Sequence, residues 1–160
     1  MFQQIMEISK MKKLRLFFSL DWEFKKLLLE AFFYLGWGRL LKLLPFSRIA
    51  PSLGQQKVET TYSLDSSFRV LLAHISQAIH LMSRYTVWES ECMVKAIAAM
   101  KMLERRQIES TIYFGTAKDM KGKLIAHAWL RSGPYYITGA DGIEGFIVVN
   151  TFAKKMTPKR

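Results

Sequence analysis

The fold is decided by the stretch at positions 88–106, WESECMVKAIAAMKMLERR, together with the change of pattern that follows it. Its apolar side chains recur at the three- and four-residue spacing of one helical face: Met93, Ile97, Met100 and Leu103. We therefore expect a helix from about Ser90 to Arg106. Beyond position 110 the pattern alternates with a period of two, which is typical of strands. Helices followed by strands with hairpin-length connections predict an α+β fold with a small antiparallel sheet.

Two further helices are expected upstream. One runs from about Trp22 to Leu44, capped by Asp21 and stopped by Pro45, because proline forces the residue before it out of the helical region. The other spans about 65–85, and the breaker-rich segment 51–56 between them is expected to be a linker. Downstream, strands are expected at four places: 111–114, 124–131, 135–138 and 146–150.

Composition limits the functions open to this chain. Half of its 160 residues are hydrophobic, and its net charge is +11. The charge favours an acidic partner (a membrane surface, a nucleic acid or an acidic peptide), although a basic surface that serves only solubility gives the same value. Lys and Arg are scattered from Lys10 to Arg160, which disfavours a non-enzymatic basic module that binds a membrane surface or a nucleic acid. The Leu- and Phe-rich stretch 27–44 is interrupted by charges, so it falls short of a bilayer-spanning helix, although it could still lie on a membrane or in a partner's groove.

The cysteine and histidine content argues against disulfides and metal sites. Cys92 is the only cysteine, so no internal disulfide can form, which fits a reducing cytoplasm. The three histidines lack the spacing of a helical zinc motif. We therefore expect a cytoplasmic protein without a metal or a cofactor.

Cys92 lies where the helical pattern begins. The first turn of a helix presents unpaired N–H groups and a partial positive charge, and both favour a thiolate over a thiol. The backbone N–H of Cys92 could also donate to an oxyanion when a carbonyl is attacked. The carboxylates of Glu89 and Glu91 oppose thiolate formation unless they point into solvent. The alternative is an inert, buried small side chain.

His127 supplies a base for such a thiol. In the strand pattern AHAWL (126–130), alternation places Ile125, His127 and Trp129 on one face and the flanking alanines on the other. A histidine that faces a helix packed on the sheet could meet the N-terminus of that helix and pair with Cys92. Asp141, 14 residues further on, is a candidate for a third group that fixes the imidazole tautomer, although aspartate is also common in glycine-rich turns for conformational reasons.

These residues together resemble the leader peptidases of bacterial lasso-peptide biosynthesis, which are transglutaminase-like cysteine proteases. The blocks that carry the resemblance are Trp88-x-x-x-Cys92, Met102-Leu103-x-Arg105-Arg106-x-Ile108, Tyr113-x-Gly115 and Ala126-His127-Ala128-Trp129-Leu130-Arg131-x-Gly133, with a weaker similarity from Glu30-Ala31 to Leu44-Pro45-Phe46. The resemblance covers roughly 25–153. It implies a transglutaminase-like, distantly papain-like core at 55–155, preceded by a helical N-terminal part at 1–50.

The resemblance also implies an activity and partners. Catalysis would use a Cys-His-Asp triad, with Cys92 and His127 carried over directly. The family's aspartate often lies nearer to the histidine, about where Thr138 and Gly139 stand, so Asp141 is only the nearest candidate. The substrate would be a precursor peptide, presented through its leader by a small separate recognition protein, with a lasso cyclase acting afterwards. We expect the helical segment from Trp22 to Leu44 to be the docking surface for the recognition protein.

Three functions therefore stay open at this point. In a peptidase, Cys92 attacks the last peptide bond of the leader, His127 protonates the leaving amine, and water releases the acyl-enzyme. In a related acyltransferase, an amine takes the place of that water. In a non-enzymatic basic module, Cys92 is inert and the chain binds a membrane surface or a nucleic acid.

Overall fold

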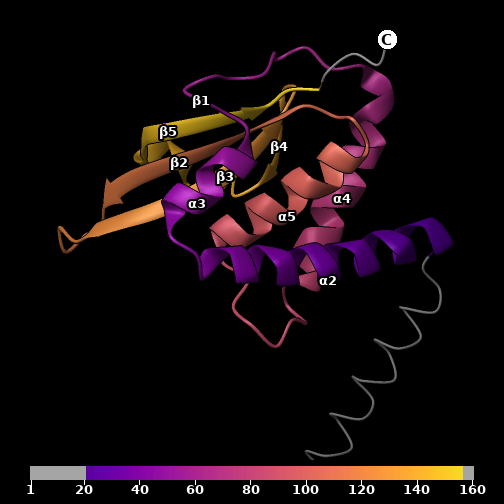
Figure 1. The fold of residues 1–160 in the computed structure, drawn as a ribbon, viewed down its shortest axis with the longest axis horizontal. Coiled ribbons are helices and arrows are strands. Elements are labelled where there is room, and N and C mark those ends of the chain that lie inside the picture. Colours follow the sequence, from indigo (N-terminus) through magenta and orange to yellow (C-terminus); the bar gives the residue numbers. More distant parts are fainter. Residues whose placement is uncertain (1–20, 157–160) are drawn as a thin grey trace, which may run out of the picture.

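The computed structural model describes residues 21–156, so the basic segment 1–20 lies outside the part considered below. The helices come first along the chain and the sheet follows (Figure 1). The helical elements are α2 (Trp22–Lys42), α3 (Phe46–Leu53), the 3₁₀ turn η1 (Ser66–Phe68), α4 (Arg69–Met82) and α5 (Cys92–Arg105), with a second 3₁₀ turn, η2 (Ile143–Gly145), late in the chain. Among them, none is long and apolar enough to cross a membrane.

One antiparallel sheet carries all the strands of this part of the chain. They are β1 (Gln55–Gln56), β2 (Ser110–Lys118), β3 (Leu124–Ser132), β4 (Tyr135–Thr138) and β5 (Ile147–Lys154). Their spatial order is β1-β5-β2-β3-β4, so the last strand pairs with β2 at the centre and not with β4. The β2–β3 hairpin projects beyond the helices (Figure 1). The expected α+β class and antiparallel pairing are confirmed.

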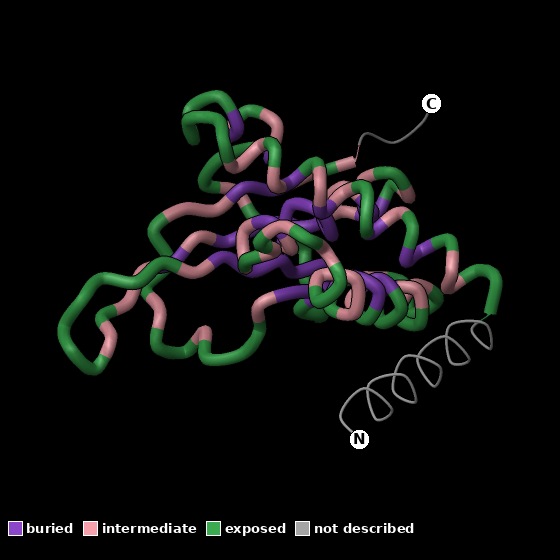
Figure 2. The backbone as a smooth tube through the Cα atoms, turned by 90° about the horizontal axis from the view of Figure 1, so that it is seen from below, coloured by how far each residue is buried: buried purple, intermediate pink, exposed green. Residues whose placement is uncertain are grey.

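The helices pack on one face of this sheet and share one hydrophobic core with it. Leu35 of α2, Ile75 of α4 and Ile97 of α5 are fully buried, and they belong to the same cluster as Ile112 of β2 and Leu130 of β3. Buried backbone accordingly lies in the middle of the molecule, and the loops at the periphery are exposed (Figure 2). The described helices of the expected N-terminal part therefore contribute to the core of the rest of the chain.

The other face of the sheet is held by a buried arginine. Arg131 is 1% exposed, and its guanidinium donates to the Tyr113 hydroxyl at 2.8 Å and to the carbonyl oxygens of Thr60, Thr61 and Gly133 at 2.9, 3.2 and 2.7 Å. It also pairs with the Glu59 carboxylate at 3.2 Å. A buried charge with this many partners is compensated. Arg131 thus fixes the 59–61 segment beneath the sheet.

The expected helices are present, with corrections at their ends. Asp21 caps α2 as expected, since its carboxylate accepts from the Glu23 N–H at 3.3 Å. The expected linker at 51–56 was wrong in its first part, because α3 begins directly after Pro45 and includes Pro51. Packing explains the difference: Ile49 and Leu53 are buried in the core, and this burial outweighs the poor helix propensity of the segment.

The strands also run further than expected. The strand expected to stop at Gly115 continues to Lys118, with an irregularity in its pairing to β5 between Phe114 and Gly115. The last strand extends to Lys154, and the two-residue β1 was missed. Short edge strands carry little sequence pattern, and a glycine in a strand signals either an end or a close approach.

Candidate active site

Cys92 is the first residue of α5 and is half-buried. Glu91 occupies the N-cap position, but its side chain makes no capping hydrogen bond. Its carboxylate is paired with the Lys42 ammonium of α2, and the hydrogen bond from Lys42 lowers the pKa of Glu91. The Lys42 ammonium therefore offsets the negative charge of Glu91, which reduces its repulsion of a Cys92 thiolate. Of the two carboxylates expected to oppose thiolate formation, Glu91 is therefore neutralised by an ion pair.

His127 lies in the first half of β3, opposite Gly115 of β2. Its ring stacks on the Trp129 side chain, with ring centres 5.8 Å apart and an angle of 26° between the planes. The Phe146 ring lies 5.2 Å away on a tilted plane. The imidazole is therefore walled by two aromatic rings, which limit its rotation and its access to water.

A backbone carbonyl holds the imidazole of His127. Its Nε2 lies 2.9 Å from the carbonyl oxygen of Gly139, the residue that follows β4. A carbonyl oxygen only accepts hydrogen bonds, so Nε2 carries the hydrogen, and in the neutral ring Nδ1 is left as the acceptor. A histidine in this tautomer can take a proton at Nδ1, as a base that activates a thiol must.

Two glycines make room for this arrangement. A Cβ on Gly115 would come within 2.8 Å of the Trp129 ring, and one on Gly139 would lie 2.7 Å from the carbonyl oxygen of Ala128 and 3.1 Å from Nε2 of His127. Gly139 also has φ of +71°, in the left-handed region that favours glycine. The close approach of backbone to ring thus depends on both glycines.

The structure places the thiol and the imidazole on neighbouring elements, but the expectation that His127 faces the packed helix was wrong, because its ring lies on the sheet face away from α5. Helix α5 packs on β3. Strand alternation gives His127 the face that carries Trp129 and the Tyr113 ring stacked on it, whereas Leu130 turns into the helical core. Within residues 21–156, no hydrogen bond joins Cys92 to His127. The catalytic pairing of these two residues stays a prediction.

Asp141 lies in the exposed loop between β4 and η2, two residues past the carbonyl that His127 contacts. In this part of the chain it makes no hydrogen bond to His127. Its charge acts instead on His80 at the end of α4. Burial and the nearby Lys95 lower the pKa of His80, and Asp141 opposes that shift. The catalytic role expected for Asp141 stays a prediction, and the Gly139 carbonyl is a second candidate for the orienting group.

The orienting carbonyl could not be found from the sequence, because every residue has one. The only signal was Gly139 itself, at the position where the resemblance placed the aspartate. Trp88, which the sequence placed four residues before Cys92, packs against Phe32 and Gly36 of α2, with ring centres 5.2 Å apart in the Phe32 pair. Its buried indole N–H has no hydrogen-bond partner among the described residues.

Comparison with known proteins decides the family. The sequence model of the transglutaminase-like superfamily matches residues 31–151, which make up most of the chain and include Cys92, His127 and Asp141. The chain belongs to the transglutaminase-like superfamily. Proteins of this superfamily are in general cysteine peptidases and acyltransferases. No curated protein and no solved structure matches the chain. The helix-borne cysteine and strand-borne histidine of this transglutaminase-like domain are thus residue types suited to thiol chemistry on carbonyl compounds.

Proposed function

We propose that this chain is a cysteine peptidase that removes the leader from a lasso-peptide precursor and works with a separate leader-recognition protein. The observation that carries the proposal is the hydrogen bond from His127 Nε2 to the Gly139 carbonyl in a transglutaminase-like domain whose only cysteine begins the helix packed on the same strand. The sequence blocks around Cys92 and His127 support the finer assignment.

The proposed reaction uses the two groups in turn. The Cys92 thiolate attacks the carbonyl of the last peptide bond of the leader, and the N–H groups of the first turn of α5 stabilise the oxyanion that forms. His127, protonated at Nδ1, then gives this proton to the departing amine of the core peptide. Water, deprotonated by the same nitrogen, attacks the thioester and releases the leader as a carboxylic acid. The Gly139 carbonyl holds the ring throughout, because Nε2 keeps its hydrogen in both protonation states.

The test is a cleavage assay with defined components. The full chain is incubated with a candidate precursor and its recognition protein, and the products are read by mass spectrometry. We expect one cut at the leader–core junction, lost in Cys92→Ala and nearly lost in His127→Ala, with both variants folded by circular dichroism. Cleavage that persists in Cys92→Ala contradicts the proposal.

The same assay separates peptidase from acyltransferase. A leader that ends in a free carboxylate indicates that water resolved the acyl-enzyme, as proposed. A leader carrying the mass of an added amine indicates acyl transfer, and so contradicts the peptidase assignment while keeping Cys92 as the nucleophile. A lasso cyclase would act on the released core and is not needed in this assay.

A further inference from the structure

Helix α2 is apolar on two opposite faces. One face is buried in the core and comprises Leu27, Leu28, Ala31, Leu35 and Gly38. The other faces solvent and comprises Trp22, Leu29, Phe33, Trp37 and Leu40, spaced by seven, four, four and three residues. We call these five exposed residues the α2 stripe. Their exposures run from 50% for Trp37 to 66% for Trp22, so the stripe is a ridge of protruding side chains along the whole helix.

Neighbouring segments widen this ridge. Leu43, directly after α2, is 68% exposed. The loop between α4 and α5 is attached to α2 through the contact of Phe32 with Trp88, and Val87 beside it is 96% exposed. In Figure 1, α2 runs along the outer edge of the molecule with this loop hanging beside it. A row of exposed apolar side chains of this length indicates a binding surface.

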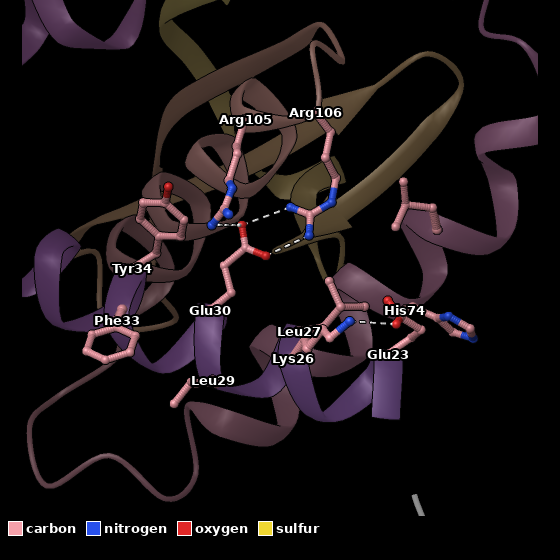
Figure 3. Close-up of a pocket in the computed structure, with 11 residues that line it drawn as sticks. Glu23, Lys26, Leu27, Leu29, Glu30, Phe33, Tyr34, His74, Arg105 and Arg106 are labelled. Atoms are coloured by element: carbon pink, nitrogen blue, oxygen red, sulfur yellow. Dashed lines mark hydrogen bonds and ion pairs between the residues drawn. The ribbon is translucent and has the colours of Figure 1, made fainter. Parts of the chain in front are cut away.

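Basic side chains border the α2 stripe. Figure 3 shows a groove beside the first half of α2 that is lined by Leu29 and Phe33 and by the two cations of this border, Arg105 and Lys26. The Lys26 ammonium is paired with the Glu23 carboxylate at 2.7 Å. The Glu30 carboxylate in this groove is already bound by Arg106, at 2.9 and 2.6 Å. Arg105 reaches Glu30 only at 3.8 Å and is 68% exposed. Its guanidinium is therefore largely available to an anion outside the protein.

We propose that the α2 stripe and its basic border bind an anionic lipid surface, with α2 lying in the plane of the headgroups. Exposed tryptophans, apolar side chains and adjoining cations are the combination that holds helices at that interface. The net charge of +11 favours an extended anionic surface. It disfavours a second copy of this chain, because a two-fold contact would bring like charges together. A convex ridge suits a deformable lipid layer better than a preformed pocket. This inference does not depend on the peptidase assignment.

The test is sedimentation of the full chain with vesicles of phosphatidylcholine alone or mixed with phosphatidylglycerol. We expect binding to the mixed vesicles that weakens as salt is added, and much weaker binding to phosphatidylcholine. The double variant Leu29→Ser/Phe33→Ser should bind about a hundredfold more weakly, since each of the two side chains buried in the lipid contributes roughly a tenfold factor. The matched control is Ile147→Ser/Val149→Ser, which removes two exposed apolar side chains from β5 and should bind as wild type.

Charge variants test the border separately. Lys26→Gln/Arg105→Gln should weaken binding to the mixed vesicles by roughly fivefold per cation. Lys121→Gln/Lys123→Gln in the exposed β2–β3 turn should have less effect. Equal binding by the stripe variant and its control overturns the proposal. The proposal is also overturned if the wild-type chain binds neither kind of vesicle. In that case, a dimer seen by light scattering would assign the stripe to a second copy, and binding of the leader-recognition protein through the stripe would assign it to that partner.

Discussion

Substituting Gly139 tests how the candidate base is held. Gly139 has φ of +71°, and an alanine in the left-handed region costs about 1–2 kcal/mol. Its Cβ would also lie 2.7 Å from the Ala128 carbonyl oxygen and 3.0 Å from Trp129 Cβ. Forcing an extra methyl into a packed site costs about 1–3 kcal/mol. We therefore expect Gly139→Ala to lower the free energy of unfolding by about 2–5 kcal/mol in total.

Gly142 provides a matched control in the same loop. Its φ of +73° is nearly the same, but a Cβ there would meet nothing within 4 Å. Gly142→Ala should therefore show the conformational cost alone, about 1–2 kcal/mol. The difference between the two variants in urea unfolding isolates the crowding around His127, and we expect about 1–3 kcal/mol.

Cleavage kinetics of the same two variants test the role of the carbonyl. The chain must shift at Gly139→Ala, so the carbonyl moves away from Nε2 of His127, and a misplacement of about 1 Å costs on the order of a hundredfold in rate. Gly142→Ala should cleave as wild type. Measurements are made where both variants are folded. If the two variants are equally stable and equally active, the reasoning about the Gly139 carbonyl is refuted.

Three further substitutions have definite expected outcomes. Glu30→Gln should lower the unfolding free energy by about 2 kcal/mol in urea titrations, because the carboxylate accepts two charge-assisted bonds from Arg106, which ties α2 to the end of α5; no change would contradict this. Asp141→Asn should reduce leader cleavage by less than about tenfold if the Gly139 carbonyl orients His127, since an intact orienting group preserves the tautomer; a loss of about a thousandfold or more would assign that role to Asp141. Burial alone would raise the pKa of Glu104, but hydrogen bonds from two lysines lower it below the usual 4.5. The ionised Glu104 therefore stabilises the fold at neutral pH, and this contribution is lost as the pH falls through the lowered pKa. The stability gap between wild type and Glu104→Gln should therefore close on acidification, and a gap that widens would contradict the sign.

Most elements could be predicted from the sequence because their patterns are local. The apolar period around Met100 fixed α5, Asp21 marked the start of α2, and β4 was placed within its observed bounds at 135–138. The failures lie where tertiary packing decides. Helix α3 forms around Pro51 because Leu53 is buried in the core, and no local preference indicates that.

The elements that carry Cys92 and His127 were predictable, but the sheet face of His127 and its contacts were not. The helix position of Cys92 and the strand position of His127 followed from periodicity, and both are observed. The partner of His127 did not follow, because a backbone carbonyl has no sequence signature. The charge on Glu91 is balanced by Lys42, which lies 49 positions earlier, and such long-range pairing cannot be predicted from one sequence.

The packing of α2 also changes how its role can be tested. Deleting residues 1–45 would be the simplest test of whether this segment docks the recognition protein. However, the described part of that segment supplies Leu27, Ala31 and Leu35 to the core, so its removal would unfold the rest. Surface substitutions such as Leu29→Ser and Phe33→Ser leave the buried face intact and are the appropriate variants.

The central claim is that His127 activates Cys92, and alkylation of the thiol tests it most directly. The chain has a single cysteine, so the rate of iodoacetamide incorporation, followed by mass spectrometry across pH, reports on Cys92 alone. We predict that the wild-type chain reacts at mildly acidic pH far faster than a free thiol, and that His127→Ala loses this reactivity while remaining folded. Identical profiles for the two proteins, both following a free thiol, would contradict the claim.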